Sequence, residues 1–226
     1  MNARTYTPSH QAPTVAGSAT GVTMTPRRAD ALRALLRAYP YVLVIEDDHF
    51  SMLSAHPYES LIAPGHERFA LIRSVSKFLG PDMCLAVAAT DPTTAERLAM
   101  RLSPGTTWVS HLLQRLTHAQ LTDARVRREI ADAATHYAAR NAAFAALLTD
   151  RGLPTGPGDG LNLWVELPVP ARDAAEQLMR RGWLARTGDE FVLASDRPSH
   201  HLRLTVHDLT EDDARRLADD LAAACA

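Results

Sequence analysis

The sequence of 226 residues has no apolar run close to the roughly 20 residues that a membrane-spanning helix needs. It has no basic N-terminal segment followed by an apolar core, which argues against a secretory signal peptide. Its two cysteines, Cys84 and Cys225, are far apart and show no CxxC or Cys/His metal spacing. We therefore expect a cytoplasmic, reduced protein that is not integral to a membrane.

A strong charge of one sign is also lacking, because 24 Lys and Arg stand against 26 Asp and Glu, a net charge of −2. The one dense basic cluster, Arg125, Arg127 and Arg128, lies in an expected helix beside Asp123 and Glu129. Bulk charge therefore gives no support for nucleic-acid binding. With 46% hydrophobic residues, the chain has ample material for a core of one or two domains.

A glycine-rich phosphate loop is missing as well. Residues 156–160 read Gly-Pro-Gly-Asp-Gly, but they lack the GxGxxG spacing and precede an expected strand rather than a helix. This stretch is interpreted as an ordinary loop.

The first half of the sequence alternates helix and strand signals. Apolar residues at helical spacing predict an amphipathic helix from about Pro26 to Pro40. Residues 41–45 form a continuous apolar run, typical of a strand buried on both faces of a parallel sheet, and run directly into Glu46-Asp-Asp-His49. Further strands are expected at 69–72 and 85–89, followed by an N-cap at Asp91 and a helix from Pro92.

Beyond these strands, residues 108–150 are expected to be entirely helical and to bridge two lobes. A smaller α+β lobe follows, with strands at 161–167, 190–193 and 201–206 and helices at 171–181 and 211–224. The expected division is 1–107, 108–150 and 151–226.

Lys77 is a candidate ligand-binding residue, because it follows the strand at 69–72 and lies between Ser74/Ser76 and a Gly-Pro turn. Ligands in open α/β sheets gather outside the carboxyl ends of strands, so Lys77 and Asp47 are expected to face one crevice. A sheltered lysine can form a Schiff base with an aldehyde, and pyridoxal phosphate is the aldehyde cofactor in common use. That cofactor needs a lysine, a carboxylate for its pyridine nitrogen and donors for its phosphate.

These segments, taken together and in order, resemble class I/II aminotransferases of PLP fold type I. They are most similar to the aminotransferase-like domain of MocR/PtsJ-type GntR-family regulators. The matching segments are residues 6–14 and 20–28, Val44–His49, Arg73–Lys77, Gly80–Asp82 and His201–Thr205. The resemblance implies an α/β fold: a partial large domain with a three-layer, mostly parallel sheet, followed by a small α+β C-terminal domain.

The resemblance also implies roles for individual residues. Lys77 would carry the Schiff base and act as general acid and base, and Asp47 would pair with the pyridine nitrogen. His49 would stand where the family often has a tyrosine, and Ser74 and Ser76 would hold the phosphate. Arg203 would grip a substrate α-carboxylate, as suits a guanidinium fork. The resemblance implies no metal. It implies an amino acid or amine as the ligand and a homodimer as the assembly.

The sequence departs from the family at several positions. Cys84 and Leu85 stand where a second phosphate anchor, an arginine, is usual, and Ala12-Pro13 replaces the usual Asn-Pro turn. The segment that precedes these motifs in the family, and the winged helix of the regulators, are not expected in this chain. A sheet of about three strands would leave an edge and apolar faces uncovered.

Four functions stay open at this stage. The first is a PLP-dependent aminotransferase-like domain, and the second is the effector-sensing part of a MocR-type regulator without its winged helix. The third is an inactive truncated remnant. The fourth is a metal hydrolase that would use Asp47, Asp48, His49 and His56.

Overall fold

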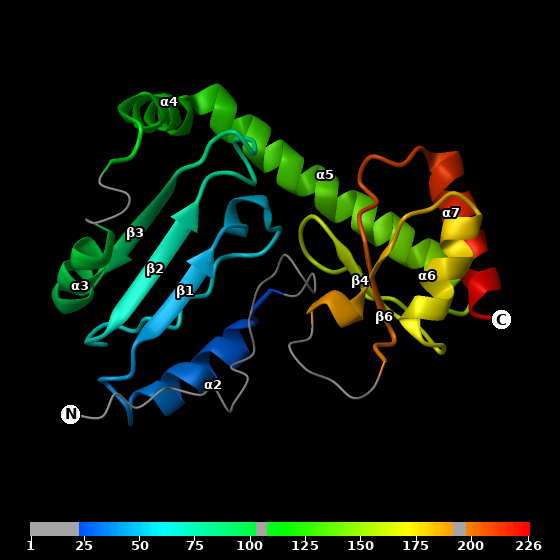
Figure 1. Ribbon diagram of the computed structural model, residues 1–226, viewed down its shortest axis with the longest axis horizontal. Helices are drawn as coiled ribbons and strands as arrows, with labels where there is room; N and C mark the ends of the chain where they lie inside the picture. Colours follow the sequence, from blue (N-terminus) through cyan, green and yellow to red (C-terminus); the bar gives the residue numbers. More distant parts are fainter. Residues whose placement is uncertain (1–22, 103–107, 192–197) are drawn as a thin grey trace.

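The computed structural model describes residues 23–102, 108–191 and 198–226. It consists of two lobes joined by one long helix (Figure 1). Sheet A, in the first lobe, has the strand order β1 (Val44–Asp48), β2 (Phe69–Ser74), β3 (Ala86–Thr90). Sheet B, in the second lobe, has the order β4 (Leu163–Glu166), β6 (His201–Leu204), β5 (Arg186–Thr187).

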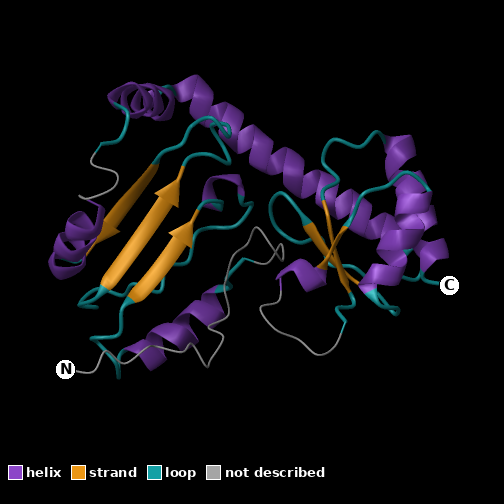
Figure 2. Cartoon of the chain, viewed as in Figure 1, coloured by secondary structure: helices purple, strands orange, loops and turns teal. Residues whose placement is uncertain are grey.

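Helices account for much of the rest of the described chain (Figure 2). In the first lobe and the bridge they are α2 (Pro26–Leu36), the short η1 (Ser51–Leu53), α3 (Pro92–Leu102), α4 (His111–Thr122) and α5 (Ala124–Thr149). In the second lobe they are α6 (Ala171–Arg180), η2 (Gly188–Phe191) and α7 (Glu211–Ala224).

Strand β1 lies three residues further along the chain than predicted. Residues 39–42 form a turn, with the Val42 N–H donating to the Tyr39 carbonyl at 3.1 Å, so the strand begins only at Val44. The prediction of a strand at 41–45 is therefore confirmed only for Val44 and Ile45, and burial on both faces is wrong because Ile45 is 61% exposed. The acidic residues 46–48 lie inside the strand, because neighbouring hydroxyl, N–H and guanidinium groups satisfy two of their three carboxylates.

Strand pairing assigns the acidic residues to opposite faces of sheet A. β1 and β2 are parallel, with Asp47 beside Ile72 and Asp48 beside Arg73, whereas β2 and β3 are antiparallel. Because successive side chains alternate, Asp47 shares a face with Ile72 and Ser74. Asp48 and Arg73 share the other face.

Two predicted helices differ in extent from those observed. The first ends at Leu36 rather than Pro40, because tight backbone bonds from Ala38 to Leu35 and from Tyr39 to Leu36 unwind the chain before the proline. The stretch predicted as entirely helical, 108–150, begins its first helix only at His111 and is interrupted at Asp123, so it forms α4 and α5, of which α5 joins the lobes. Asp123 has an extended ψ of 124° and its carboxylate accepts from the Arg125 N–H at 2.7 Å, so it caps a new helix, as aspartate does well.

Several other predicted elements are observed. Asp91 caps α3 through the Thr94 N–H at 3.0 Å, as expected. Helices α6 and α7 and strands β2, β3, β4 and β6 lie within one or two residues of their predicted positions. The strand predicted at 190–193 is wrong for Glu190 and Phe191, which lie in η2, and its remaining residues lie outside the described part of the chain.

The core of the second lobe forms where one face of sheet B meets three helices. Leu163, Val165, Leu202 and Leu204 point inward from β4 and β6. They pack in one cluster with residues of α5, α6 and α7, including Phe144, Leu148, Leu178, Leu217 and Leu221. Full burial of such a side chain stabilises the fold by about 1.5–3 kcal/mol, so this lobe has a substantial core.

Sheet A is much less covered. Ile45 is 61% exposed on one face and Val87 is 62% exposed on the other, and β3 is almost entirely exposed. Within the described residues, no helix has the length and apolar character required to cross a membrane.

Candidate functional site

Lys77 lies in a tight turn directly after β2. Buried Val75 anchors this turn, because its carbonyl accepts from the Leu79 N–H at 2.9 Å and its own N–H donates to Leu85 at 3.2 Å. Gly80 then takes a φ of +111°, a conformation that side chains other than glycine rarely adopt. The turn holds the Lys77 backbone in place while its side chain is exposed.

Lys77 is the only lysine in the sequence, among 23 arginines. Within the described part of the chain, no carboxylate lies within 4.0 Å of its ammonium group, so no ion pair there occupies it. Its amine is therefore available to a ligand.

Two hydroxyls lie beside the lysine. Ser74 Oγ and Ser76 Oγ are 2.9 Å apart and half-buried, and the Ser76 N–H lies 3.4 Å from Ser74 Oγ. Both serines can turn their O–H groups toward an anion at this strand end.

Asp47 and His49 lie at the carboxyl end of β1, next to the strand that leads to Lys77. The Asp47 side chain is 71% exposed, and its Oδ1 is 3.6 Å from His49 Nδ1. Since Asp47 shares a face of sheet A with Ser74, the carboxylate and the hydroxyl pair belong to one side of the sheet.

Asp48 has a structural role on the opposite face. Its carboxylate accepts from Ser51 Oγ at 2.6 Å, the Ser51 N–H at 2.9 Å and Arg73 Nε at 2.8 Å. Burial alone would raise the pKa of Asp48, but these bonds, with one from Phe50, outweigh it and lower the pKa. Asp48 therefore stays ionised and fixes the chain that leaves β1.

Glu46 closes a second structural network on this face. It accepts from Tyr58 Oη and Ser60 Oγ, each at 2.8 Å, and from the Leu61 N–H. Burial first and the Glu46 carboxylate second raise the pKa of Tyr58, so its phenol remains a donor. The Arg73 guanidinium stacks over the Tyr58 ring at 5.1 Å from its centroid.

Three of the side chains considered as metal ligands, Asp47, Asp48 and His49, lie in different surroundings. Asp48 is bound by Ser51 and Arg73, whereas the Asp47 side chain is 71% exposed and the His49 side chain is 20% exposed. In residues 23–102, 108–191 and 198–226, no three His, Cys, Asp or Glu side chains converge as metal ligands would.

Arg203 lies in the other lobe, on β6. Its pKa is lowered by burial first and by the charge of Arg186 second, with Glu190 opposing. Its guanidinium stacks over the Phe191 ring at 5.2 Å from the centroid.

Cys84, where the family usually has arginine, is exposed and its Sγ lies 3.7 Å from the Pro81 carbonyl. Ala12 and Pro13 lie outside the described residues.

Sequence reasoning missed Asp159, which connects the lobes. It is 4% exposed and accepts hydrogen bonds from Ser54 Oγ, the Ala55 N–H at 2.9 Å and Thr23 Oγ1. The stretch 156–160 is a loop, as expected, but its one charged residue binds the loop after β1. A lone carboxylate among glycines was the only sequence signal for this contact.

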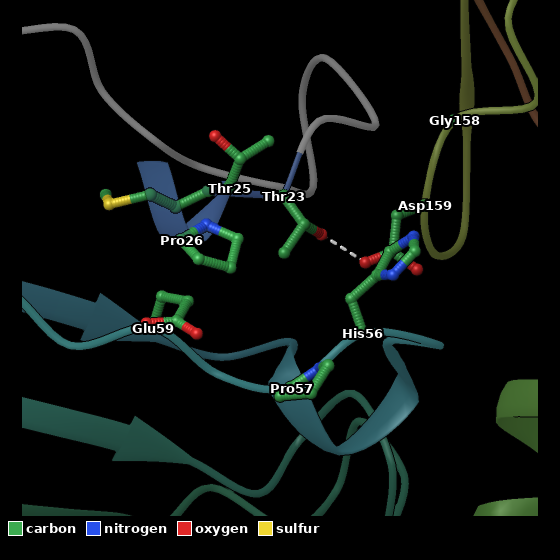
Figure 3. A pocket seen from close by; sticks show the side chains of 9 residues that line it. Thr23, Thr25, Pro26, His56, Pro57, Glu59, Gly158 and Asp159 are labelled. Atoms are coloured by element: carbon green, nitrogen blue, oxygen red, sulfur yellow. Dashed lines mark hydrogen bonds between the residues drawn. The ribbon is translucent and has the colours of Figure 1, made fainter. Parts of the chain in front are cut away.

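A cavity of about 370 Å³ lies beside this contact (Figure 3). Asp159 and His56 border one end of it, while Thr25 and Pro26 at the start of α2 lie opposite Pro57 and Glu59. The remaining residues of its wall are Thr23, Met24 and Gly158. Asp159 and Glu59 already have partners, the latter being Arg33 at 3.0 Å, so the cavity has few free charges.

The fold of the chain is that of aminotransferases. An aromatic aminotransferase from Pyrococcus horikoshii matches with a TM-score of 0.78 and 15% identity, covering 91% of this chain and 56% of that one. An α-aminoadipate aminotransferase from Thermus thermophilus matches with a TM-score of 0.78 and 22% identity, over 92% and 56%. Aspartate aminotransferase from Thermus thermophilus has a TM-score of 0.76 and 20% identity, over 91% and 54%.

In sequence the chain is similar to a regulator. It is 43% identical over 202 residues to PtsJ, a transcriptional repressor of the vitamin B6 salvage pathway from Salmonella typhimurium. The match covers 89% of this chain and 46% of PtsJ, so the chain spans about half the length of this relative. No family model matches the chain. The chain thus has the fold of aminotransferases and is similar in sequence to about half of the regulator PtsJ.

Proposed function

We propose that this chain is a pyridoxal-phosphate-binding domain that senses an amino acid or amine for a PtsJ-type regulator. One observation carries the proposal: in an aminotransferase fold, the sole lysine follows β2, and an exposed carboxylate, Asp47, lies on the adjacent parallel strand. The 43% identity to a repressor supports a sensing role over turnover.

The residues present fit this cofactor in kind. Lys77 would hold it covalently through a C=N bond, and the Ser74/Ser76 hydroxyls would bind its phosphate. Asp47 would pair with the pyridine nitrogen, with His49 beside it. Cys84 provides no second cation for the phosphate, and we expect a weaker cofactor affinity than an arginine there would give.

Each of these residues would contribute a defined step. When bound, pyridoxal phosphate supplies an electron sink for the bond at the substrate α-carbon. Lys77, once its amine is released, would move a proton at that α-carbon. Arg203 would orient the ligand by binding its α-carboxylate. Transamination is the second candidate function, and the aminotransferase fold of the chain supports it.

We also propose that the chain is divided into residues 1–107, 108–150 and 151–226. We further propose that it forms a homodimer. The exposed apolar faces of sheet A support association with another polypeptide surface.

Absorbance titration with pyridoxal phosphate tests the proposal. The wild type is expected to develop a saturable band of the bound cofactor that is absent in Lys77→Ala. Asp47→Asn is expected to weaken cofactor affinity by about 10- to 100-fold, because a charge-assisted bond contributes about 1.5–3 kcal/mol. Asp82→Asn, an exposed carboxylate in the next turn, is the matched control and should leave affinity unchanged.

Equal titration curves for the wild type and Lys77→Ala would refute cofactor binding at this lysine. Catalytic turnover is measured separately, by chromatography of the amino acid formed from a 2-oxo acid when a second amino acid is supplied as the amino donor. Cofactor binding with ligand-dependent spectral change but no product supports sensing, whereas steady product formation supports the transaminase alternative.

A further inference from the structure

Two arginines lie directly opposite each other on the outer face of sheet B. The antiparallel register pairs Arg186 of β5 with Arg203 of β6, and Arg203 in turn with Trp164 of β4. These side chains share the face turned away from the core, since the alternate residues Leu202 and Leu204 are buried. Side chains at such directly opposite positions have Cβ atoms about 4.5–5.5 Å apart.

Like charges at directly opposite positions destabilise a sheet. Burial first and the charge of Arg186 second lower the pKa of Arg203, whereas Glu190 opposes this. No carboxylate of the described residues lies within 4.0 Å of the Arg203 guanidinium. Arg186 has only an exposed contact with Glu190, at 3.8 Å. The described residues therefore leave most of this positive charge uncompensated.

Aromatic rings lie beside the Arg203 guanidinium and hold it in place. Phe191 lies under Arg203, and Trp164 packs edge-on against Phe191 at 5.6 Å between centroids. The His201 ring also stacks with Trp164, at 5.4 Å between centroids and an interplanar angle of 19°. A cation held over a ring loses less freedom when it binds an anion than a mobile surface arginine does.

We propose that Arg186 and Arg203 together bind a dicarboxylic ligand, one carboxylate on each guanidinium fork. Each fork can bind one carboxylate in a bidentate manner, and two adjacent forks match two carboxylates on a short chain. This inference rests on the proposed function and specifies its ligand class: an acidic amino acid or the corresponding oxo acid. Arg203 binds the α-carboxylate, and Arg186 is the residue that selects for the second acid group.

Isothermal titration calorimetry with glutarate, butyrate and inorganic phosphate tests this, using cofactor-free protein. The wild type is expected to bind glutarate about 10-fold or more tightly than butyrate, as one added charge-assisted contact implies. In Arg186→Gln the two affinities should become equal within about 2-fold, and in Arg203→Gln both should fall by about 10-fold or more. The same measurements in Lys77→Ala separate this inference from cofactor binding, because failure at Lys77 leaves glutarate binding intact.

Arg180→Gln is the matched control. Arg180 is 64% exposed and pairs with an acid four residues away, as Arg186 does at 65% exposure, but it lies on α6 away from the pair. It should leave glutarate affinity unchanged. Without ligand, Arg186→Gln should raise the melting temperature slightly because repulsion is relieved, and this also verifies that the variant folds.

Three results would overturn the inference: equal wild-type affinity for glutarate and butyrate, a glutarate preference that survives in Arg186→Gln, or phosphate binding as tight as that of glutarate. The last result would mean a general anion surface rather than a dicarboxylate site.

Discussion

The ring of Phe50 occupies the space in which a side chain at Gly160 would begin. A Cβ atom built on Gly160 would lie 1.9 Å from Cζ of this ring, and Gly160 has a φ of +89°. The Gly160 carbonyl also accepts from Asn141 Nδ2 of α5, at 2.7 Å. The loop before β4 is thus held against both the bridge helix and the segment that follows β1.

Gly160→Ala should destabilise the protein markedly. The methyl group would clash with Phe50, and the left-handed backbone would be strained, so we expect a loss of about 2–5 kcal/mol in the free energy of unfolding. Urea unfolding measures it. Gly156→Ala, in the same loop with nothing within 4 Å of the added Cβ, should change stability by less than about 1 kcal/mol. Equal effects of the two substitutions would contradict this packing.

Asp159→Ala should loosen the contact between the lobes. It removes the acceptor of the Ala55 N–H and the Thr23 hydroxyl and one of the two acceptors of the Ser54 hydroxyl, and we expect a loss of about 1–3 kcal/mol. Limited proteolysis should then cut residues 154–161 faster than in the wild type. Asp150→Ala, at an exposed helix end, is the control, and identical cleavage rates in the two variants would rule out a role of Asp159 in joining the lobes.

Acid should destabilise the protein through Asp91. The neighbouring Thr94 hydroxyl first, then the N–H groups of Thr94 and Phe69 and the charge of Arg68, lower the pKa of Asp91 from 3.8 to about 2. A lowered folded-state pKa stabilises the fold above the unfolded value, and this stabilisation disappears as the pH falls from 3.8 toward 2. Unfolding free energy measured across this range should therefore decrease less steeply in Asp91→Asn. An unchanged slope would show that Asp91 titrates alike in both states.

The exposed faces of sheet A should drive association at high protein concentration. Ile45 and Val87 are each more than 60% exposed, on opposite faces. Sedimentation velocity over a range of concentrations should show oligomers that weaken by about 10-fold or more in Ile45→Thr/Val87→Thr, because about 1.5–3 kcal/mol accompanies burial of each side chain. A wild type that remains monomeric throughout would contradict this expectation.

The sequence allowed the lysine turn and most of the strand and helix order to be predicted, because these depend on local patterns. The α3 cap is one example, since Asp91-Pro92 specifies it within a few residues. The start of β1 could not be located, because the turn at 39–42 and pairing with β2 decide it. This shift determines which acid is exposed: Asp47 and Asp48 are adjacent in sequence but lie on opposite faces.

Local sequence patterns could not predict the contacts between distant segments. Asp159 and Ser54 are 105 residues apart, and only the approach of the lobes brings them together. The pairing of Arg186 with Arg203 likewise depends on strand register, which the short strand β5 does not reveal by periodicity.

The most direct test of the central claim is reductive trapping at Lys77. Borohydride treatment of the protein mixed with pyridoxal phosphate, followed by peptide mass spectrometry, locates any cofactor held through a C=N bond. Because Lys77 is the only lysine, only one side chain can react. The account predicts one phosphopyridoxyl group on the peptide that contains Lys77, saturable with cofactor concentration and lost in Lys77→Arg. Absence of the modification from Lys77, or labelling of the N-terminal amine alone, would contradict it.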